Sequence, residues 1–324
     1  MGIGIIRGGM LGGIVSFLGF TFPSVLALII FAYFLNTFPI AESGAIQGLK
    51  IVAVAVVAHA ILNMSKKLTP TLTHKFIALI ALTVTLLWQT TISQIVVIIG
   101  AGIIGLFIFN NQLDKDQALI NIKISKKVAA FCLVLFGALL GLLPLLREVI
   151  QTNWIAMFDS FYRSGALVFG GGHVVLPLLE REFVPTGLLT EQQFLTGYGA
   201  AQAVPGPLFT FAAYIGAVQS GWLGGIIATI AIFLPAFLLI FGILPFWNQL
   251  RNHSKMKGAF VSVNAAVVGI LIAAFYQPIW TSTIINAVDF VFAAILFSLL
   301  AFWKQPGWLI VLIGALGGFL LGLI

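Results

Sequence analysis

The chain has 324 residues, of which 60% are hydrophobic and only 8% charged. Water-soluble domains carry about 25% charged residues because their surface must be hydrated, so this composition excludes a soluble protein. The formal net charge is +7, but the basic residues are spread over short segments and form no continuous patch for nucleic acid.

Long apolar runs predict a helical membrane protein, because the strands of a β-barrel would alternate apolar and polar residues. The first run is too long for a signal-peptide core, so we expect it to be retained as a membrane helix. We therefore expect an all-α polytopic protein with about 9–11 hydrophobic segments, some of them broken or re-entrant. The runs fall at roughly 10–38, 51–63, 76–92, 95–109, 128–146, 161–179, 194–218, 222–248, 259–279, 284–302 and 307–324.

The basic residues predict an orientation in the membrane. Because Lys and Arg are retained in cytoplasmic loops, the most basic connections should share the cytoplasmic side, together with the N-terminus. The stretch from Arg147 to Arg251 must then cross the membrane an odd number of times, which gives about nine or eleven crossings. Twelve of the 16 basic residues fall on this side, namely Arg7, Lys66, Lys67, Lys75, Lys115, Lys123, Lys126, Lys127, Arg251, Lys255, Lys257 and Lys304.

An internal repeat appears when GMLGGIVSFLGFTFP (9–23) is laid on GWLGGIIATIAIFLP (221–235). The matched glycines and the matched prolines all differ by 212 positions. The loop after the first copy is predicted outside and the loop after the second inside, so the two copies should run antiparallel. Inverted repeats with a binding site at their interface are a recurring architecture of secondary transporters.

Polar and helix-breaking residues concentrate in the segment 159–219. Three consecutive glycines at 170–172 stand beside His173, and successive backbone N–H groups in such a run form a concave site for an anion. The Pro-Gly-Pro run at 205–207 cannot continue a regular helix. Both runs predict broken helices or re-entrant hairpins, which membrane proteins tolerate only where protein or a water-filled cavity satisfies the backbone.

The same segment supplies the groups that a partly dehydrated tetrahedral dianion needs. A charge in the bilayer interior costs about 2.5 kcal/mol or more, so hydrogen-bond donors and positive charges must compensate it. A carboxyl removed from bulk water binds a proton more readily, which makes Glu180 and Glu182 the candidates for proton coupling. The candidate substrate-binding residues are Gly170, Gly171, Gly172, His173, Arg163, Arg181, Gln202, Pro205, Gly206 and Pro207.

Several of these features also have simpler interpretations. The charged run 180–182 would form a solvated loop if the preceding helix ended at Leu179. The lone His59 in an apolar run fits a hydrogen-bonded packing residue better than a proton relay. The GxxxG spacings near the C-terminus, at 314–322, are typical of helix packing.

Other classes of function lack support in the sequence. The single cysteine, Cys132, provides neither a disulfide framework nor a thiol metal cluster. We find no HExxH, GxSxG or GxxxxGK[ST] motif, so we expect neither an enzyme nor an ATP-driven pump, and no cofactor or metal.

The runs FGGGHVVLPLLEREFV (169–184) and AAQAVPGPL (200–208), with the Gly-x-Leu-Gly-Gly unit and its following proline, resemble the chromate ion transporter family. The resemblance covers approximately residues 159–279, and the earlier copy of the glycine unit extends it to the N-terminal half. It implies secondary active export of chromate by proton antiport across the cytoplasmic membrane. It also implies an incomplete N-terminal transporter half at 1–146 and a complete C-terminal half at 147–324.

Alternatives to this function remain open at this point. Sulfate is a tetrahedral dianion of similar size, so the substrate could be sulfate or another oxyanion. No counterpart of residues 159–212 precedes Met1, so the chain could be a truncated, inactive or partner-dependent subunit. The partners we expect are an oxyanion, protons, the lipid bilayer and a second or homologous chain, without nucleic acid.

Overall fold

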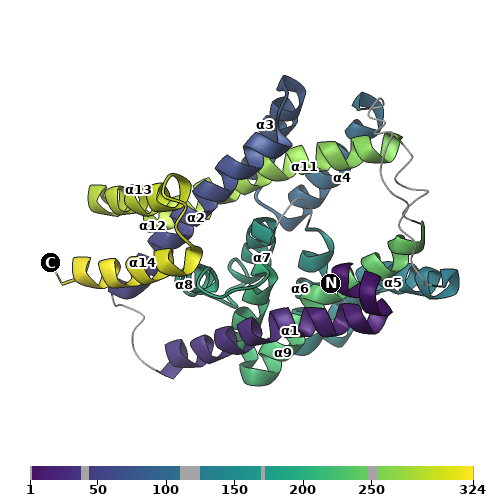
Figure 1. Ribbon diagram of the computed structural model, residues 1–324, viewed down its shortest axis with the longest axis horizontal. Helices are drawn as coiled ribbons and strands as arrows, with labels where there is room; N and C mark the ends of the chain where they lie inside the picture. Colours follow the sequence, from purple (N-terminus) through teal and green to yellow (C-terminus); the bar gives the residue numbers. More distant parts are fainter. Residues whose placement is uncertain (1, 38–43, 110–124, 169–171, 247–253, 324) are drawn as a thin grey trace.

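The computed structural model describes residues 2–37, 44–109, 125–168, 172–246 and 254–323, and these residues form helices without any strand (Figure 1). The all-α prediction is therefore confirmed. In chain order the elements are α1 (Gly2–Thr37), α2 (Gly44–Leu68), α3 (Leu72–Leu87), α4 (Thr91–Ile108), α5 (Lys126–Ile150), α6 (Asn153–Ala166), η1 (Gly172–Val174), α7 (Val175–Phe183), α8 (Glu191–Ala201), η2 (Leu208–Thr210), α9 (Phe211–Ile243), η3 (Leu244–Phe246), α11 (Ser254–Ala274), η4 (Phe275–Trp280), α12 (Thr281–Thr283), α13 (Ala287–Ala301) and α14 (Gly307–Leu321).

Apolar helices long enough to cross a bilayer confirm a polytopic membrane protein. A helix rises 1.5 Å per residue, so about 20 residues cross the 30 Å hydrocarbon core. Five such stretches occur among the described residues, at Leu11–Leu35, Gly44–Leu68, Lys126–Ile150, Leu208–Phe246 and Met256–Thr283. Shorter apolar helices accompany them at Leu72–Leu87, Ile92–Ile108, Ala287–Ala301 and Gly307–Leu321.

The repeat is visible in the backbone of α1 and α9. Gly9 and Gly221 lie 212 positions apart and share a left-handed conformation, with φ of 61° and 65°. Each forms a kink, and after the second kink the chain folds back so that Gly216 contacts the carbonyl oxygen of Gly224. Glycine is favoured at such kinks, because residues with a side chain rarely adopt a positive φ.

The two repeat copies pack antiparallel, as predicted. The Tyr33 hydroxyl, near the end of α1, accepts a hydrogen bond at 3.1 Å from the Trp222 backbone N–H, just after the α9 kink. The Phe17 ring, early in α1, packs edge-on against Phe233 and Phe237, late in α9, with ring centroids 4.7 and 4.8 Å apart. The inverted repeat is therefore confirmed by contacts at both ends of the helix pair.

Helices from the two parts of the chain pack against one another. α2 of the first half packs against α13 and α14 of the second, and α11 of the second half packs against α3 and α4 of the first (Figure 1). Gly44 and Gly48 of α2 contact the backbone of α14 at Gly318 and Gly314. The C-terminal glycines serve helix packing, as predicted. Helices from residues 1–146 thus pack directly against helices from residues 147–324.

The polar segment 159–219 lies between two groups of helices. Figure 1 shows α6, α7 and α8 between α1 and α9 on one side and α2 and α11 on the other. The segment is made of two hairpins of short helices. The apolar runs at 161–179 and 194–218 therefore contain returning helices, because each is interrupted at its glycine or proline run.

Candidate functional site

The first hairpin consists of α6, the break that includes His173, and α7. Arg163 of α6 donates a hydrogen bond at 3.0 Å to Glu182 of α7, which joins the two helices across the break. α7 continues through Phe183, and Glu182 is buried. This helical structure excludes the alternative of a solvated loop after Leu179.

The second hairpin consists of α8, the Pro-Gly-Pro break, η2 and the first part of α9. The Tyr214 hydroxyl of α9 donates at 2.9 Å to the Gln193 carbonyl oxygen of α8. The Tyr214 ring lies directly on Gly197, where any side chain would overlap it. The predicted interruption of the helix by Pro205 and Pro207 is confirmed, since α8 ends at Ala201 and the next helical turn begins at Leu208.

The two breaks meet. Gly172 of the first break faces Leu208 of the second, and a Cβ added to Gly172 would lie 3.4 Å from the Leu208 Cβ. α1 reaches the same place, where the Ser24 hydroxyl donates to the Pro205 carbonyl oxygen. Gly206 has a φ of 146° and is so close to Ser24 that only glycine fits without a shift. The repeat helix α1 therefore supports the second break.

His173 connects the breaks through a side chain of α8. Its Nδ1 lies 2.7 Å from the hydroxyl oxygen of Tyr198, which is fully buried and also interacts with Gln202. The Gln202 Nε2 is buried without a hydrogen-bond partner among the described residues. The structure thus brings together His173 and Gln202 of the predicted set, whereas Gly170 and Gly171 lie outside the described residues.

Two residues that interact with His173, Tyr198 and His59, were not predicted as site residues. Tyr198 stands among small residues in the run GYGAA, so no spacing singled it out. His59 of α2 interacts electrostatically with His173, and its Nε2 lies 2.9 Å from the Asn63 amide nitrogen. His59 therefore has the hydrogen-bonded packing role that we expected and also faces the site. Its spacing of four from Asn63, on one side of α2, was the available signal.

A charge cluster holds the first hairpin. Asp159 accepts from Arg163 at 2.8 Å and from Arg147 of α5 at 3.4 Å. Glu182 accepts from Arg163 and, at 2.9 Å, from the Ser160 hydroxyl. Two carboxylates and two guanidinium groups balance, and Asp159 is wholly buried. The predicted substrate ligand Arg163 and the predicted proton carrier Glu182 are therefore occupied by contacts within the protein.

Arg181 attaches α7 to the α3–α4 connection. It donates to the carbonyl oxygens of Thr90 at 2.7 Å and of Thr85 at 2.9 Å. In the described part of the chain it makes no salt bridge, so hydrogen bonds hold its guanidinium group but no carboxylate neutralises it at contact distance. Among the described residues, Arg181 makes no hydrogen bond with His173, Tyr198 or Gln202.

Glu180 differs from its neighbour Glu182. Among the described residues its carboxyl has neither a hydrogen bond nor a salt bridge. It lies on the short α7, outside the candidate spans, and burial raises its pKa from 4.5 to about 7, with Glu191 adding to the rise and Arg181 opposing it. Such a carboxyl exchanges a proton near neutral pH.

Among the residues that the structure describes, no group of three His, Cys, Asp or Glu side chains lies close enough to hold a metal ion. The components of the site are two interrupted hairpins that meet inside an inverted repeat. Broken helices at a repeat interface are the way in which secondary transporters form their binding sites. The fold and site therefore define the class of the protein as a multi-pass membrane transporter.

Comparison with known proteins shows the family. The family model for chromate transporters matches residues 1–106 and 155–319, so the chain belongs to the chromate transporter family. The match includes both hairpins and both copies of the repeat. No solved structure gives a significant match.

Curated relatives extend the comparison. The chain is 26% identical over 278 residues to an uncharacterized transporter of Methanocaldococcus jannaschii, over 84% of this chain and 67% of that protein. It is 27% identical over 281 residues to a chromate transport protein of Pseudomonas aeruginosa, over 83% and 64%. It is 29% identical over 191 residues to a probable chromate transport protein of Synechococcus elongatus, over 55% and 47%. The chain thus matches about half to two thirds of each relative.

Proposed function

We propose that the protein exports chromate across the cytoplasmic membrane by proton antiport. The observation that carries this proposal is the meeting of two helix breaks, Gly172 against Leu208, beside His173 at the interface of an inverted repeat. A relative from Pseudomonas aeruginosa is named as a chromate transport protein, which supports chromate as the anion.

In this proposal neutral donors hold the anion. Gly172, the Gln202 amide and the ring of His173 lie near the place where the breaks meet. The backbone N–H groups of Gly170 and Gly171 are the further donors that we propose. The Pro-Gly-Pro run at 205–207 interrupts the helix there, and Arg181 contributes positive charge from a distance, whereas the charge of Arg163 is balanced by Asp159 and Glu182. An anion in a low-dielectric site needs such fixed dipoles because water no longer solvates it.

The coupling proton in this proposal resides on Glu180. The alternative carrier, Glu182, accepts hydrogen bonds from Ser160 and Arg163, which stabilise its charged form. Glu180 has no such partner among the described residues and can therefore change protonation without breaking a contact. In one half of the cycle the anion leaves the cell, and in the other the proton enters.

The orientation follows from the basic residues. With a cytoplasmic N-terminus, α1 ends at the external face, and both hairpins enter the membrane from that face with their breaks at its interior. The long second part of α9 then makes the single crossing between Arg147 and Arg251, in agreement with the odd number that the charges require.

The test is labelled-chromate uptake into inverted vesicles from cells that express this chain, with and without a proton gradient. Export by antiport predicts gradient-dependent uptake together with a rise in lumenal pH, followed with an acridine dye. Sulfate in excess identifies competition from a second tetrahedral dianion. His173→Ala and Gln202→Ala should each lower uptake about tenfold or more at equal protein level, because each removes a donor at the breaks.

Uptake equal to that of empty vesicles, with folded protein present, would contradict chromate transport by this chain alone. Addition of a homologous chain then tests partner dependence. Uptake of sulfate but not of chromate would mean that the same site transports sulfate instead of chromate. Uptake without a lumenal pH change would reject antiport.

A further inference from the structure

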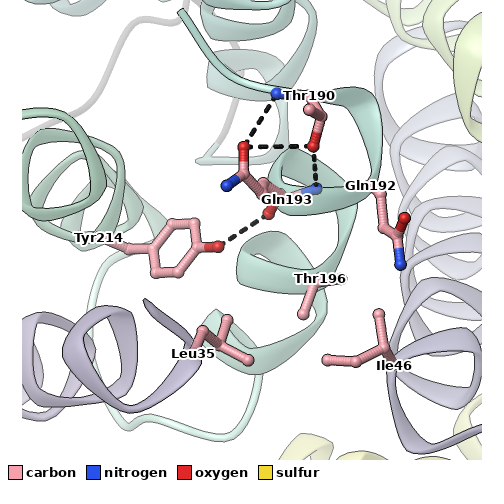
Figure 2. A pocket seen from close by; sticks show the side chains of 7 residues that line it. All are labelled: Leu35, Ile46, Thr190, Gln192, Gln193, Thr196 and Tyr214. Carbon is pink, nitrogen blue, oxygen red and sulfur yellow. Dashed lines mark hydrogen bonds between the residues drawn. The ribbon is translucent and has the colours of Figure 1, made fainter. Parts of the chain in front are cut away.

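A pocket of about 270 Å³ lies at the N-terminal end of α8, away from the breaks. Figure 2 shows it between the end of α1, the start of α2 and the first part of α9. One water occupies about 30 Å³ of liquid, so the pocket has room for a small oxyanion with part of its hydration shell. The lining residues are Leu35, Ile46, Thr190, Gln192, Gln193, Thr196 and Tyr214.

Thr196 is the notable side chain of this pocket. It is 2% exposed, and its Oγ1 has no hydrogen-bond partner among the described residues. Figure 2 shows the side chain between Leu35 and Ile46. Because a buried hydroxyl without a partner destabilises a fold, such a group in a cavity indicates a ligand that satisfies it.

A second donor is positioned beside Thr196. The Gln193 Oε1 accepts from the Thr190 backbone N–H at 3.0 Å and from the Thr190 hydroxyl at 3.2 Å. This fixes the amide, whose Nε2 makes no hydrogen bond with the described residues (Figure 2). The Tyr214 hydroxyl donates to the backbone carbonyl oxygen of Gln193. These hydrogen bonds hold the N-terminal end of α8, and the Gln193 Nε2 and the Thr196 hydroxyl have no hydrogen-bond partner among the described residues.

The charged side chains near this end of α8 do not line the pocket. Glu191 at the start of α8 interacts electrostatically with Lys50 of α2, which lies one turn beyond Ile46. Glu180 also interacts with Glu191. No charged side chain is among the lining residues. Neutral donors without a contacting charge bind an anion weakly, which suits a site that must release its ligand.

We propose that this pocket is a second, transient site for the transported oxyanion, with the Thr196 hydroxyl and the Gln193 amide as its donors. This inference rests on the proposed function and adds a step to it. Gln202, the residue after the end of α8, lies six positions beyond Thr196, so the two sites are about 9 Å apart along the helix axis. The pocket opens at the face predicted to be external, so it serves as the exit site of the exporter.

The experiment measures equilibrium binding of labelled chromate and labelled sulfate to the purified full chain in lipid nanodiscs. Thr196→Val keeps the shape and removes the hydroxyl, whereas Thr196→Ser keeps the hydroxyl. The matched control is Thr229→Val, because the Thr229 hydroxyl bonds the carbonyl oxygen of Gly225 within its own helix. Thermal unfolding of each variant is measured in parallel.

We expect Thr196→Val to bind the second anion about three- to tenfold more weakly, because it loses one neutral hydrogen bond. Thr196→Ser and Thr229→Val should stay within about twofold of the wild type. Thr196→Val should unfold at the same temperature or higher, because it removes an unpaired buried hydroxyl. A purely structural Thr196 would show this stability gain without the loss of binding.

Unchanged binding by Thr196→Val overturns the inference. If the wild type then still binds chromate or sulfate and His173→Ala still abolishes that binding, the central site stands and only the second site fails. If the wild type binds neither anion, the proposed function and this inference fail together. If the wild type binds one anion per chain and Thr196→Val does not change that binding, the second site is also rejected.

Discussion

The two hairpins at the centre of the molecule are held by different forces. α6 and α7 are joined by ion pairs, with Arg163 between Asp159 and Glu182 at 2.8 and 3.0 Å. α8 and the first part of α9 are joined by aromatic rings and neutral hydrogen bonds, including the edge-on pair Phe194–Phe211 with centroids 5.1 Å apart. The charged side chains of the first hairpin pair with one another, whereas the second hairpin contains neutral donors that have no hydrogen-bond partner among the described residues.

This difference bears on how an anion is recognised. A guanidinium group that already holds two buried carboxylates cannot move to a substrate without leaving those carboxylates unpaired, which is costly. The neutral donors near the breaks and in the pocket of Figure 2 come from α8, at Gln193 and Thr196, and from Gln202 just after its end. We therefore expect changes in the ion pairs between α6 and α7 to alter stability, and changes in the neutral donors near the breaks to alter transport.

The largest expected effect is on stability, from Arg163→Gln. It leaves the fully buried Asp159 and the buried Glu182 with only Arg147, and breaking such a cluster costs about 3–5 kcal/mol. Thermal unfolding in detergent measures this, with a thiol-reactive dye as the probe, because the single cysteine, Cys132, is buried in the folded chain.

The matched control for this prediction is the double variant Arg163→Gln with Asp159→Asn. Removing both partners should cost less than the sum of the two single changes, since Asp159 is then no longer a buried carboxylate that has lost Arg163. Additive losses would show that the Arg163–Asp159 pair does not stabilise the first hairpin.

Gly197→Ala should destabilise the second hairpin by about 1–3 kcal/mol, because the added methyl overlaps the buried Tyr214 ring. Gly137→Ala is the control, since nothing lies within 4 Å of a Cβ at that position of α5. We expect Gly137→Ala to leave the unfolding temperature unchanged or raise it. Equal effects of the two substitutions would mean that ring packing on Gly197 does not hold the hairpin.

The sequence predicted the framework of the site better than its contacts. The 212-residue offset predicted antiparallel α1 and α9, and Pro205 and Pro207 predicted the second break, because glycine and proline act through local backbone geometry. The long-range contacts of Asp159 and Arg181 were not predictable. They include Arg147 of α5, which donates to Asp159, and the backbone carbonyl oxygens that Arg181 contacts, which only the tertiary fold brings near.

Glu180→Gln should remove the pH dependence of chromate exchange. The pKa of Glu180 is raised from 4.5 to about 7, so its protonated fraction falls about tenfold between about pH 6 and 8. The folded state binds the proton more tightly than the unfolded state, so stability is greatest below pH 4.5 and falls as the pH rises to about 7. Glu180→Gln should flatten both profiles.

The measurement is the initial rate of labelled-chromate uptake at fixed gradient over that pH range, with Glu182→Gln for comparison. If Glu182→Gln instead abolishes the pH dependence and Glu180→Gln retains it, the assignment of the proton to Glu180 is wrong.

The smallest expected effect comes from Ser24→Ala, which removes the hydrogen bond from α1 to the Pro205 carbonyl oxygen. One neutral hydrogen bond contributes about 1 kcal/mol, and Pro205 is exposed, so other donors can replace part of it. Ser65→Ala is the control, because the Ser65 hydroxyl bonds only within its own helical turn, to the Leu62 carbonyl oxygen at 3.1 Å. If α1 positions the second break, Ser24→Ala should raise the half-saturating chromate concentration by a few fold while the unfolding temperature barely moves. A fall in stability with unchanged chromate affinity would assign this contact to the packing of the inverted repeat alone.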